Sequence, residues 1–109
     1  MLVRTDIPLA GQIVQVGHAC VEAGHRFDQP ADPCHLVVLS VPTAHHLRAA
    51  LYRVGRAGIR CAVFHEPDDQ LGDTAACTEP ISGAYRRVFR RFPLWSGDTL
   101  SSARGPPVR

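Results

Sequence analysis

The chain has 109 residues, of which 45% are hydrophobic and 20% charged, and its formal net charge is +2 at pH 7. These values are typical of one soluble globular domain with a modest core. No apolar run approaches the roughly 20 residues that cross a bilayer. The first residues, MLVRTD, lack the basic and apolar regions of a signal peptide. The composition argues against a membrane-spanning or secreted protein, and we expect a cytoplasmic location.

Arginine and cysteine are the informative residue types in this composition. All 12 basic residues are arginine, so no lysine-dependent chemistry is available to the chain. Four cysteines are present, and no two have the C-x-x-C spacing of a metal or redox motif. We interpret them as reduced and mostly buried, with a disulfide pair as the alternative. They are Cys20, Cys34, Cys61 and Cys77.

A short strand over residues 1–6 precedes the first predicted helix, which runs from about Gly11 to Phe27. Residues spaced by three and four give this helix an apolar side and a polar side. The apolar side, which we expect to face the core, has Ile13, Val16, Cys20, Ala23 and Phe27. The polar side has Gln12, Gln15, His18, Glu22 and His25. Two glutamines and a histidine in the first turns indicate either a solvated face or one wall of a site.

A strand and a second helix follow a proline-containing loop. Residues 34–42 predict a buried strand with a continuous apolar core over residues 36–39. Thr43 can cap the next helix at its N-terminus, and Gly55 or Gly58 can end it. The side of this helix that we expect to face the core has Ala44, Leu47, Leu51 and Val54.

The remaining elements are a strand over residues 59–66, a turn-rich loop, a short strand over residues 74–79 and a helix through about Arg91. Four arginines at positions i, i+1, i+4 and i+5 of that helix share one face, which either binds phosphates or is simply solvated. They are Arg86, Arg87, Arg90 and Arg91. Residues 1–94 form the predicted domain, and the polar residues 95–109 are predicted to be a disordered tail.

The predicted order is strand, helix, strand, helix, strand, strand, helix. Long crossover helices favour right-handed parallel units, and the short link before the last strand favours antiparallel pairing. This order predicts an α/β fold, a three-layer α/β/α sandwich around a small mixed four-stranded sheet. Ligands of such sheets bind beyond the carboxyl ends of the parallel strands. Those ends carry Thr5–Asp6, Ser40–Val41 and the acidic segment FHEPDD, near a helix N-terminus that favours anions.

Four motifs follow one another along the chain: VRTD, GQ-x-x-Q-x-x-HA, CAVFHEPD and TAACTEP. Their order and spacing resemble the bacterial branch of the peptidyl-tRNA hydrolase 2 family, and the resemblance covers residues 1 to about 93. It implies a cytoplasmic esterase that cleaves the ester between a peptide and the 3′-terminal ribose of tRNA, recycling the tRNA. It also implies peptidyl-tRNA as the partner, a homodimer, and no metal or organic cofactor.

The resemblance also implies a set of catalytic residues. Glu66 stands where the family usually has an aspartate, and Asp68 is a second candidate. The Gly-Lys pair of the family reads Gly11–Gln12 here, or its lysine falls at Gly11 in the other register, so the lysine is absent. Glutamine is a poorer donor to a developing oxyanion because it carries no charge. The implied set is Asp6, Gln12, Gln15, His18, Glu66, Asp68 and Thr74.

A mechanism can be sketched with this set. Glu66 or Asp68 would act as general base on water, with His18 as a proton relay. The helix N-terminus and the Gln12 or Gln15 amide would stabilise the oxyanion, and the arginines near the C-terminus would bind tRNA phosphates. Structural alternatives remain: Asp6 can be a turn or cap residue, and four others can simply be solvated, namely Gln15, His18, Glu66 and Asp68.

Two further functions remain open for a chain that lacks the lysine. One is a catalytically weak or inactive tRNA-binding module of the same fold, and the other is a dimeric scaffold protein. We expect no zinc site, because His18 and Cys20 lie on different sides of a helix and no second ligand pair has the required spacing.

Overall fold

The computed structural model describes residues 1–97, and its elements follow the predicted order. Its helices are α1 (Leu9–Arg26), α2 (Ala44–Arg56) and the 3₁₀ helices η1 (Asp68–Gln70) and η2 (Gly83–Phe89). Its strands are β1 (Leu2–Arg4), β2 (Leu39–Val41), β3 (Cys61–Glu66) and β4 (Gly72–Thr78). Within residues 1–97, no helix is long and apolar enough to cross a bilayer.

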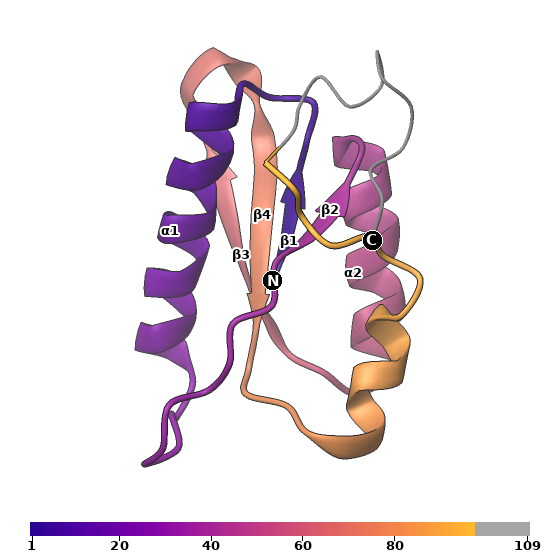
Figure 1. The fold of residues 1–109 in the computed structure, drawn as a ribbon. Coiled ribbons are helices and arrows are strands. Elements are labelled where there is room, and N and C mark those ends of the chain that lie inside the picture. The colour runs from indigo at the N-terminus through magenta and orange to yellow at the C-terminus, as the bar shows by residue number, and fades with distance from the viewer. Residues whose placement is uncertain (98–109) are drawn as a thin grey trace.

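The strands form one mixed sheet in the order β2-β1-β4-β3. Strand β1 is parallel to β2, and β4 is antiparallel to both β1 and β3. Helix α1 covers one face of this sheet and α2 the other (Figure 1). The predicted α/β fold with a mixed four-stranded sheet is confirmed. Because β1, β2 and β3 run in the same direction, their carboxyl ends meet at one edge, where both helices begin.

Each face of the sheet has its own core. Leu2 and Ala76 pack with α2, whereas the neighbouring residues Val3 and Ala75 pack with α1, because successive strand residues point to opposite faces. On the α2 side, Leu47 and Val54 are buried as predicted. The Thr43 side chain caps α2 by accepting a hydrogen bond from the His46 backbone N–H, as predicted.

Helix α1 is rotated about its axis relative to the prediction. Gln12 and Gln15 are buried, whereas Ile13 is 58% exposed. The small residues Ala19 and Ala23 complete the buried side. The predicted polar side was therefore wrong for the two glutamines. They are stable inside because their amides have hydrogen-bond partners there, which a pattern of hydrophobicity does not reveal.

The predicted strand over residues 34–42 is mostly irregular, and its expected buried core is wrong at two positions. Leu36 and Val37 are exposed, and only Leu39–Val41 form β2. The physical reason is pairing, because β1 provides hydrogen-bonding partners over three residues only. On the far side of β2, Leu39 forms an isolated antiparallel bridge with Leu94.

The C-terminal part of the described chain also differs from the prediction. A 3₁₀ helix, η2, replaces the expected α-helix, so the four arginines do not form the stripe expected of 3.6 residues per turn. After η2 the chain returns along β2, where the Trp95 N–H donates to the Val38 carbonyl at 2.8 Å. Trp95 packs against the core under α1, so the folded domain extends past residue 94. The remainder of the predicted tail, residues 98–109, lies outside the described residues.

All four cysteines are free thiols. Cys20, Cys61 and Cys77 are half-buried, whereas Cys34 is exposed, so the expectation of burial was wrong for Cys34. Burial raises the pKa of the Cys77 thiol to about 11. That thiol is therefore protonated at neutral pH and a weak nucleophile.

Candidate functional site

The candidate site lies at the edge of the sheet where β1 and β3 end. The start of α1 and the turn containing η1 lie at this same end of the molecule (Figure 1). Helix α1 has no side-chain cap and no acidic residue in its first turn. The first N–H groups of an α-helix have no acceptor within the helix. This edge therefore combines hydrogen-bond donors with the acidic residues of the β3–β4 turn.

Gln15 connects three elements at this edge. Its Nε2 donates to Glu66 Oε2 on β3 at 3.1 Å, and its Oε1 accepts from Thr74 Oγ1 on β4 at 2.7 Å. Gln15 is 5% exposed and Thr74 is fully buried. Because the Glu66 carboxylate only accepts hydrogen bonds, the Gln15 Nε2 faces it and the Oε1 faces the Thr74 hydroxyl. Gln15 and Thr74 are therefore suited to position Glu66 rather than to contact a substrate.

A bulge in the sheet makes this connection. Phe64 pairs with Ala75 and His65 with Asp73, so Thr74 has no partner directly opposite. An extra residue in one strand re-aims the side chains beside it. Thr74 and Ala75 consequently both lie on the α1 side of the sheet, which regular alternation along β4 would not allow.

Glu66 is a half-buried carboxylate held in its charged form. Besides the bond from Gln15, its Oε1 accepts a hydrogen bond from the Asp68 backbone N–H at 3.2 Å. The Gln15 amide, followed by the Asp68 N–H, lowers the pKa of Glu66 below its ordinary value. Hydrogen bonds to a carboxylate favour its charged form. Glu66 is therefore ionised at neutral pH and can accept a proton.

His18 lies beside this group on the exposed surface of α1. Its ring stacks on Phe64 of β3, with ring centroids 4.3 Å apart and an angle of 8° between the planes. His18 also contributes a favourable charge interaction to the lowered pKa of Glu66. The structure therefore brings together four of the residues that the resemblance implied: Gln15, His18, Glu66 and Thr74.

Asp6 is committed to an ion pair. Arg4 donates to both Asp6 carboxylate oxygens, at 2.9 and 3.0 Å. The same guanidinium donates to the carbonyls of Leu71 and Asp73, which ties the end of β1 to the turn before β4. This geometry favours the structural alternative for Asp6. It also leaves Arg4 occupied, so this arginine does not replace the absent lysine.

Gln12 cannot act as the oxyanion donor that the sequence suggested. It is only 1% exposed, and its Nε2 donates to the Ile7 carbonyl at 2.8 Å. Its Oε1 accepts from Trp95 Nε1 at 2.7 Å. The amide therefore joins the start of α1 to the C-terminal segment. The contribution of Trp95 was missed, although a lone tryptophan at the start of a polar segment is a signal that could have indicated packing.

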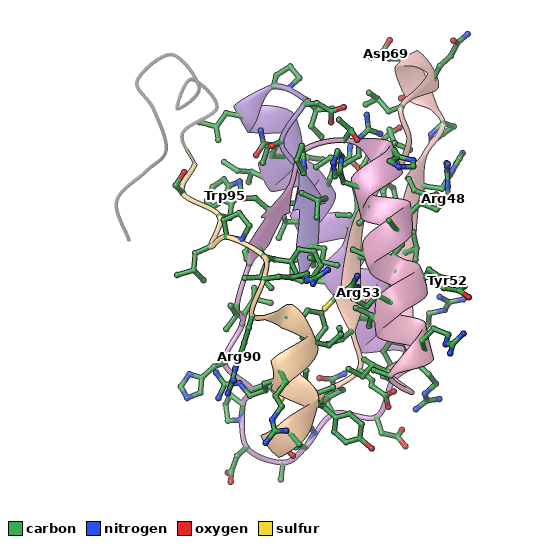
Figure 2. The ribbon with its side chains drawn as sticks, turned by 90° about the vertical axis from the view of Figure 1, so that its right-hand side faces the viewer. Arg48, Tyr52, Arg53, Asp69, Arg90 and Trp95 are labelled. Atoms are coloured by element: carbon green, nitrogen blue, oxygen red, sulfur yellow. The ribbon has the colours of Figure 1, made fainter. Side chains whose placement is uncertain are left out.

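The remaining predicted residues lie apart from this group. Asp68 is exposed at the start of η1 and contacts Glu66 through its backbone only. The exposed arginines 86, 87, 90 and 91 belong to η2 and the turn after it, at the opposite end of the molecule (Figure 1). Figure 2 shows the same separation between Asp69 at one end and Arg90 at the other. The structure does not bring the arginine cluster to the sheet edge.

This edge carries one accessible carboxylate, Glu66, and two exposed imidazoles, His18 and His65, both of which contribute to the lowered pKa of Glu66. Among residues 1–97, no three His, Cys, Asp or Glu side chains are grouped closely enough to hold a metal ion. No protein-family model, curated protein or solved structure matches the chain.

Proposed function

We propose that this protein is a peptidyl-tRNA hydrolase that cleaves the ester between a peptide and the 3′ ribose of tRNA, in the cytoplasm and without a cofactor. The observation that supports this proposal is the chain of hydrogen bonds from Thr74 through Gln15 to Glu66, beside His18. Together with His18, this chain contains four of the seven residues that the family resemblance implies.

In the proposed reaction, Glu66 accepts a proton from water as the water oxygen attacks the ester carbonyl carbon. The resulting oxyanion is stabilised by the free N–H groups at the start of α1. The bond to the ribose oxygen then breaks, and His18 relays to the 3′ oxygen the proton that Glu66 took from water, which returns both side chains to their starting states. Gln15 and Thr74 act as positioning residues, because they fix the Glu66 carboxylate and are themselves buried.

The proposed enzyme is slow, for two reasons. Hydrogen bonds stabilise the Glu66 carboxylate, and a carboxylate with a lowered pKa is a weaker base. Among residues 1–97, no free side-chain cation stands at the start of α1, because Gln12 is buried and Arg4 is paired. Loss of one charged oxyanion donor costs roughly a hundredfold or more in rate.

Single-turnover hydrolysis of an N-acetylated aminoacyl-tRNA tests this proposal. We expect wild type to exceed spontaneous hydrolysis, and Glu66→Gln to lose roughly a hundredfold or more in rate. Asp69→Asn is the matched control, because Asp69 is an exposed acidic residue of the same turn, and its rate should equal that of wild type. A wild-type rate equal to the spontaneous one, or full activity in Glu66→Gln, would overturn the proposal.

A second candidate function is a tRNA-binding module without turnover. The hydrogen bonds of the Gln12 amide to Ile7 and Trp95 favour this function. They occupy both ends of the side chain at the family's lysine position, so this side chain is not free to contact a substrate. In the same assay, this function predicts that the protein binds the N-acetylated aminoacyl-tRNA and leaves its ester bond intact. Stable binding with no hydrolysis would therefore select this candidate.

A homodimer, or a purely dimeric scaffold, has a candidate surface on the outer side of α1. Ile13, Val14 and Val21 are each more than half exposed there, and exposed apolar groups of this kind are typical of contact surfaces. We propose that a second copy covers them. Light scattering should show a dimer for wild type and a monomer for Val21→Glu; equal masses for the two would exclude this surface.

A further inference from the structure

Helix α2 and η2 form a surface without acidic residues. Residues 43–58 and 80–92 contain no aspartate and no glutamate. Seven exposed arginines lie on this surface, which we call the α2–η2 face: Arg48, Arg53, Arg56, Arg86, Arg87, Arg90 and Arg91. None of them forms an ion pair within residues 1–97, whereas Arg4, Arg26 and Arg60 each pair with a carboxylate. Positive charge is therefore concentrated and uncompensated on one side of the molecule.

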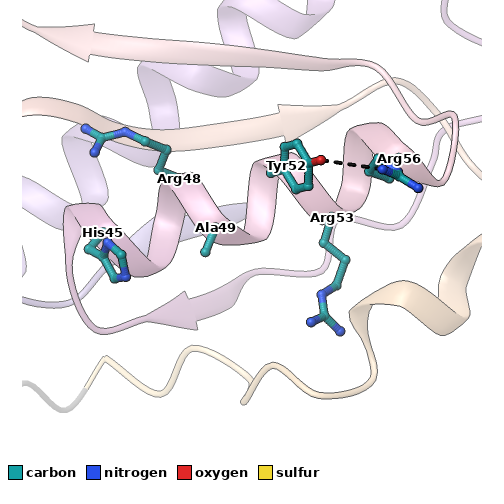
Figure 3. Close-up of a pocket in the computed structure, with 6 residues that line it drawn as sticks. All are labelled: His45, Arg48, Ala49, Tyr52, Arg53 and Arg56. Atoms are coloured by element: carbon teal, nitrogen blue, oxygen red, sulfur yellow. Dashed lines mark hydrogen bonds between the residues drawn. The ribbon is translucent and has the colours of Figure 1, made fainter.

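A shallow hollow of about 550 Å³ lies along the outer side of α2 (Figure 3). It is lined by His45, Arg48, Ala49, Tyr52, Arg53 and Arg56. Figure 3 shows Arg53 pointing from α2 toward η2, the second basic element. The lining of the hollow combines three arginines with the rings of Tyr52 and His45.

Tyrosine is the only large apolar residue that this face exposes within the described chain. Tyr52 is 69% exposed, and its hydroxyl accepts a hydrogen bond from Arg56 Nη1 at 3.4 Å. Tyr85 on η2 is 55% exposed. An exposed aromatic ring between arginines offers a stacking surface to a nucleic-acid base beside donors for its phosphates.

The composition of the α2–η2 face distinguishes two kinds of polyanion. A helix that lies on an anionic membrane buries leucine, phenylalanine or tryptophan among the lipids, and this face exposes none of these. Arginine with interspersed tyrosine is instead the combination that binds single-stranded nucleic acid. The charge and the aromatic residues therefore favour RNA over a lipid surface.

We propose that the α2–η2 face binds single-stranded RNA, with arginines of the hollow on successive phosphates and Tyr52 stacked on a base. This surface extends along α2, outside the acid–base group of Glu66 and His18. That the bound RNA belongs to a tRNA rests on the proposed function, whereas RNA binding by this face does not. Helix α2 thus has a role that its sequence alone did not indicate.

Fluorescence anisotropy with a labelled 12-nucleotide RNA of mixed sequence tests the proposal over a range of salt concentrations. Arg53→Gln/Arg56→Gln should weaken binding roughly tenfold and reduce the salt slope by about 1.4, because each lost phosphate contact of a single strand contributes about 0.7. Arg26→Gln/Arg60→Gln is the matched control, since it removes the same charge from outside this face. It should change the affinity less than twofold.

A second pair of variants tests the stacking. Tyr52→Leu should weaken RNA binding roughly tenfold, whereas Tyr52→Phe should retain it because the ring remains. Unchanged thermal unfolding of every variant excludes a folding defect.

Three results would overturn the proposal. The first is that wild type does not bind the RNA, and the second is that the two double variants lose equal affinity for it. The third is that Arg53→Gln/Arg56→Gln weakens binding to vesicles of 30% phosphatidylserine in phosphatidylcholine but leaves RNA binding unchanged. The RNA probe contains no carboxylic ester, so its binding is measured independently of peptidyl-ester hydrolysis. Failure of the proposed enzyme would leave this result standing.

Discussion

Helices α1 and α2 pack on opposite faces of one sheet, but they bury different kinds of side chain. Helix α2 buries Leu47 and Val54 and exposes arginines. Helix α1 buries Gln12 and Gln15 and exposes Ile13. The difference shows two ways in which a helix is held to a sheet. Apolar contact holds α2 without directional constraint, whereas hydrogen bonds hold the start of α1 in one orientation.

In our proposal, this difference separates two functions on one small fold. A polar contact beneath a helix fixes the positions of particular atoms, and at α1 these atoms belong to the carboxylate of Glu66. An apolar contact leaves the outer side of a helix free of constraint, and at α2 that side carries the arginines. In our account, α1 positions the reacting group and α2 carries the surface for RNA.

The largest expected effect is on the apolar side of this comparison. Leu47 is fully buried in the core beneath α2, so Leu47→Ala should lower the free energy of unfolding by about 2–5 kcal/mol. Tyr52→Ala, on the exposed side of the same helix, should lower it by less than about 0.5 kcal/mol. Urea denaturation measures both. Similar losses in the two variants would show that α2 is not held by its buried side.

Position 12 offers the next test, on the polar side of the comparison. Gln12→Lys would restore the residue type of the family, but it would place a cation where the side chain is 1% exposed. We expect it to lower the free energy of unfolding by about 1–3 kcal/mol, because the Trp95 and Ile7 groups would lose their partners.

Ile13→Lys is the control for this variant, since the next residue along α1 is exposed. It should leave the free energy of unfolding within about 0.5 kcal/mol of wild type. If Gln12→Lys were as stable as Ile13→Lys in the same urea titration, the account of Gln12 as an internal contact would fail.

A smaller effect is expected in the titration of Glu66. The Gln15 amide is the largest cause of the lowered pKa of Glu66, so Gln15→Leu should raise that pKa toward the ordinary value of a glutamate. Because the pKa is lowered in the folded state, this hydrogen bond stabilises wild type above the unfolded-state pKa. Its contribution is lost as the pH falls through the folded-state pKa.

Carbon-detected NMR of the Glu66 side chain would follow this titration. Gln29→Leu is a suitable control because Gln29 is exposed and, within the part of the chain that the structure describes, its side chain hydrogen-bonds to the carbonyl of Phe27 and not to Glu66. An unchanged Glu66 titration in Gln15→Leu would mean that Gln15 does not hold the carboxylate.

The sequence predicted the parts of the fold that depend on pattern and order. The Thr43 cap, the buried residues Leu47 and Val54, and the antiparallel β4 are confirmed. The rotation of α1 was not predictable, because hydrophobicity assigns a glutamine to solvent unless its partners are known. Those partners, Thr74 and Trp95, come from positions 59 and 83 residues away along the chain.

The candidate site was also predictable where it depends on the order of motifs, and not where it depends on contacts between distant residues. Motif order grouped four residues at one edge of the sheet, where the structure has them: Gln15, His18, Glu66 and Thr74. The bulge that turns Thr74 toward α1 depends on pairing between two strands, which no local pattern encodes. The outer surface of α2 was missed because its arginines are spread through a helix, and only the fold joins them to η2.

The division between the two helices is tested most directly by steady-state hydrolysis of N-acetylated aminoacyl-tRNA. The account predicts that Glu66→Gln lowers kcat by roughly a hundredfold and leaves KM close to that of wild type. It predicts that Arg53→Gln/Arg56→Gln raises KM by roughly tenfold and leaves kcat unchanged. A wild type without turnover, or two variants that change the same kinetic parameter, would contradict the assignment of chemistry to α1 and of RNA binding to α2.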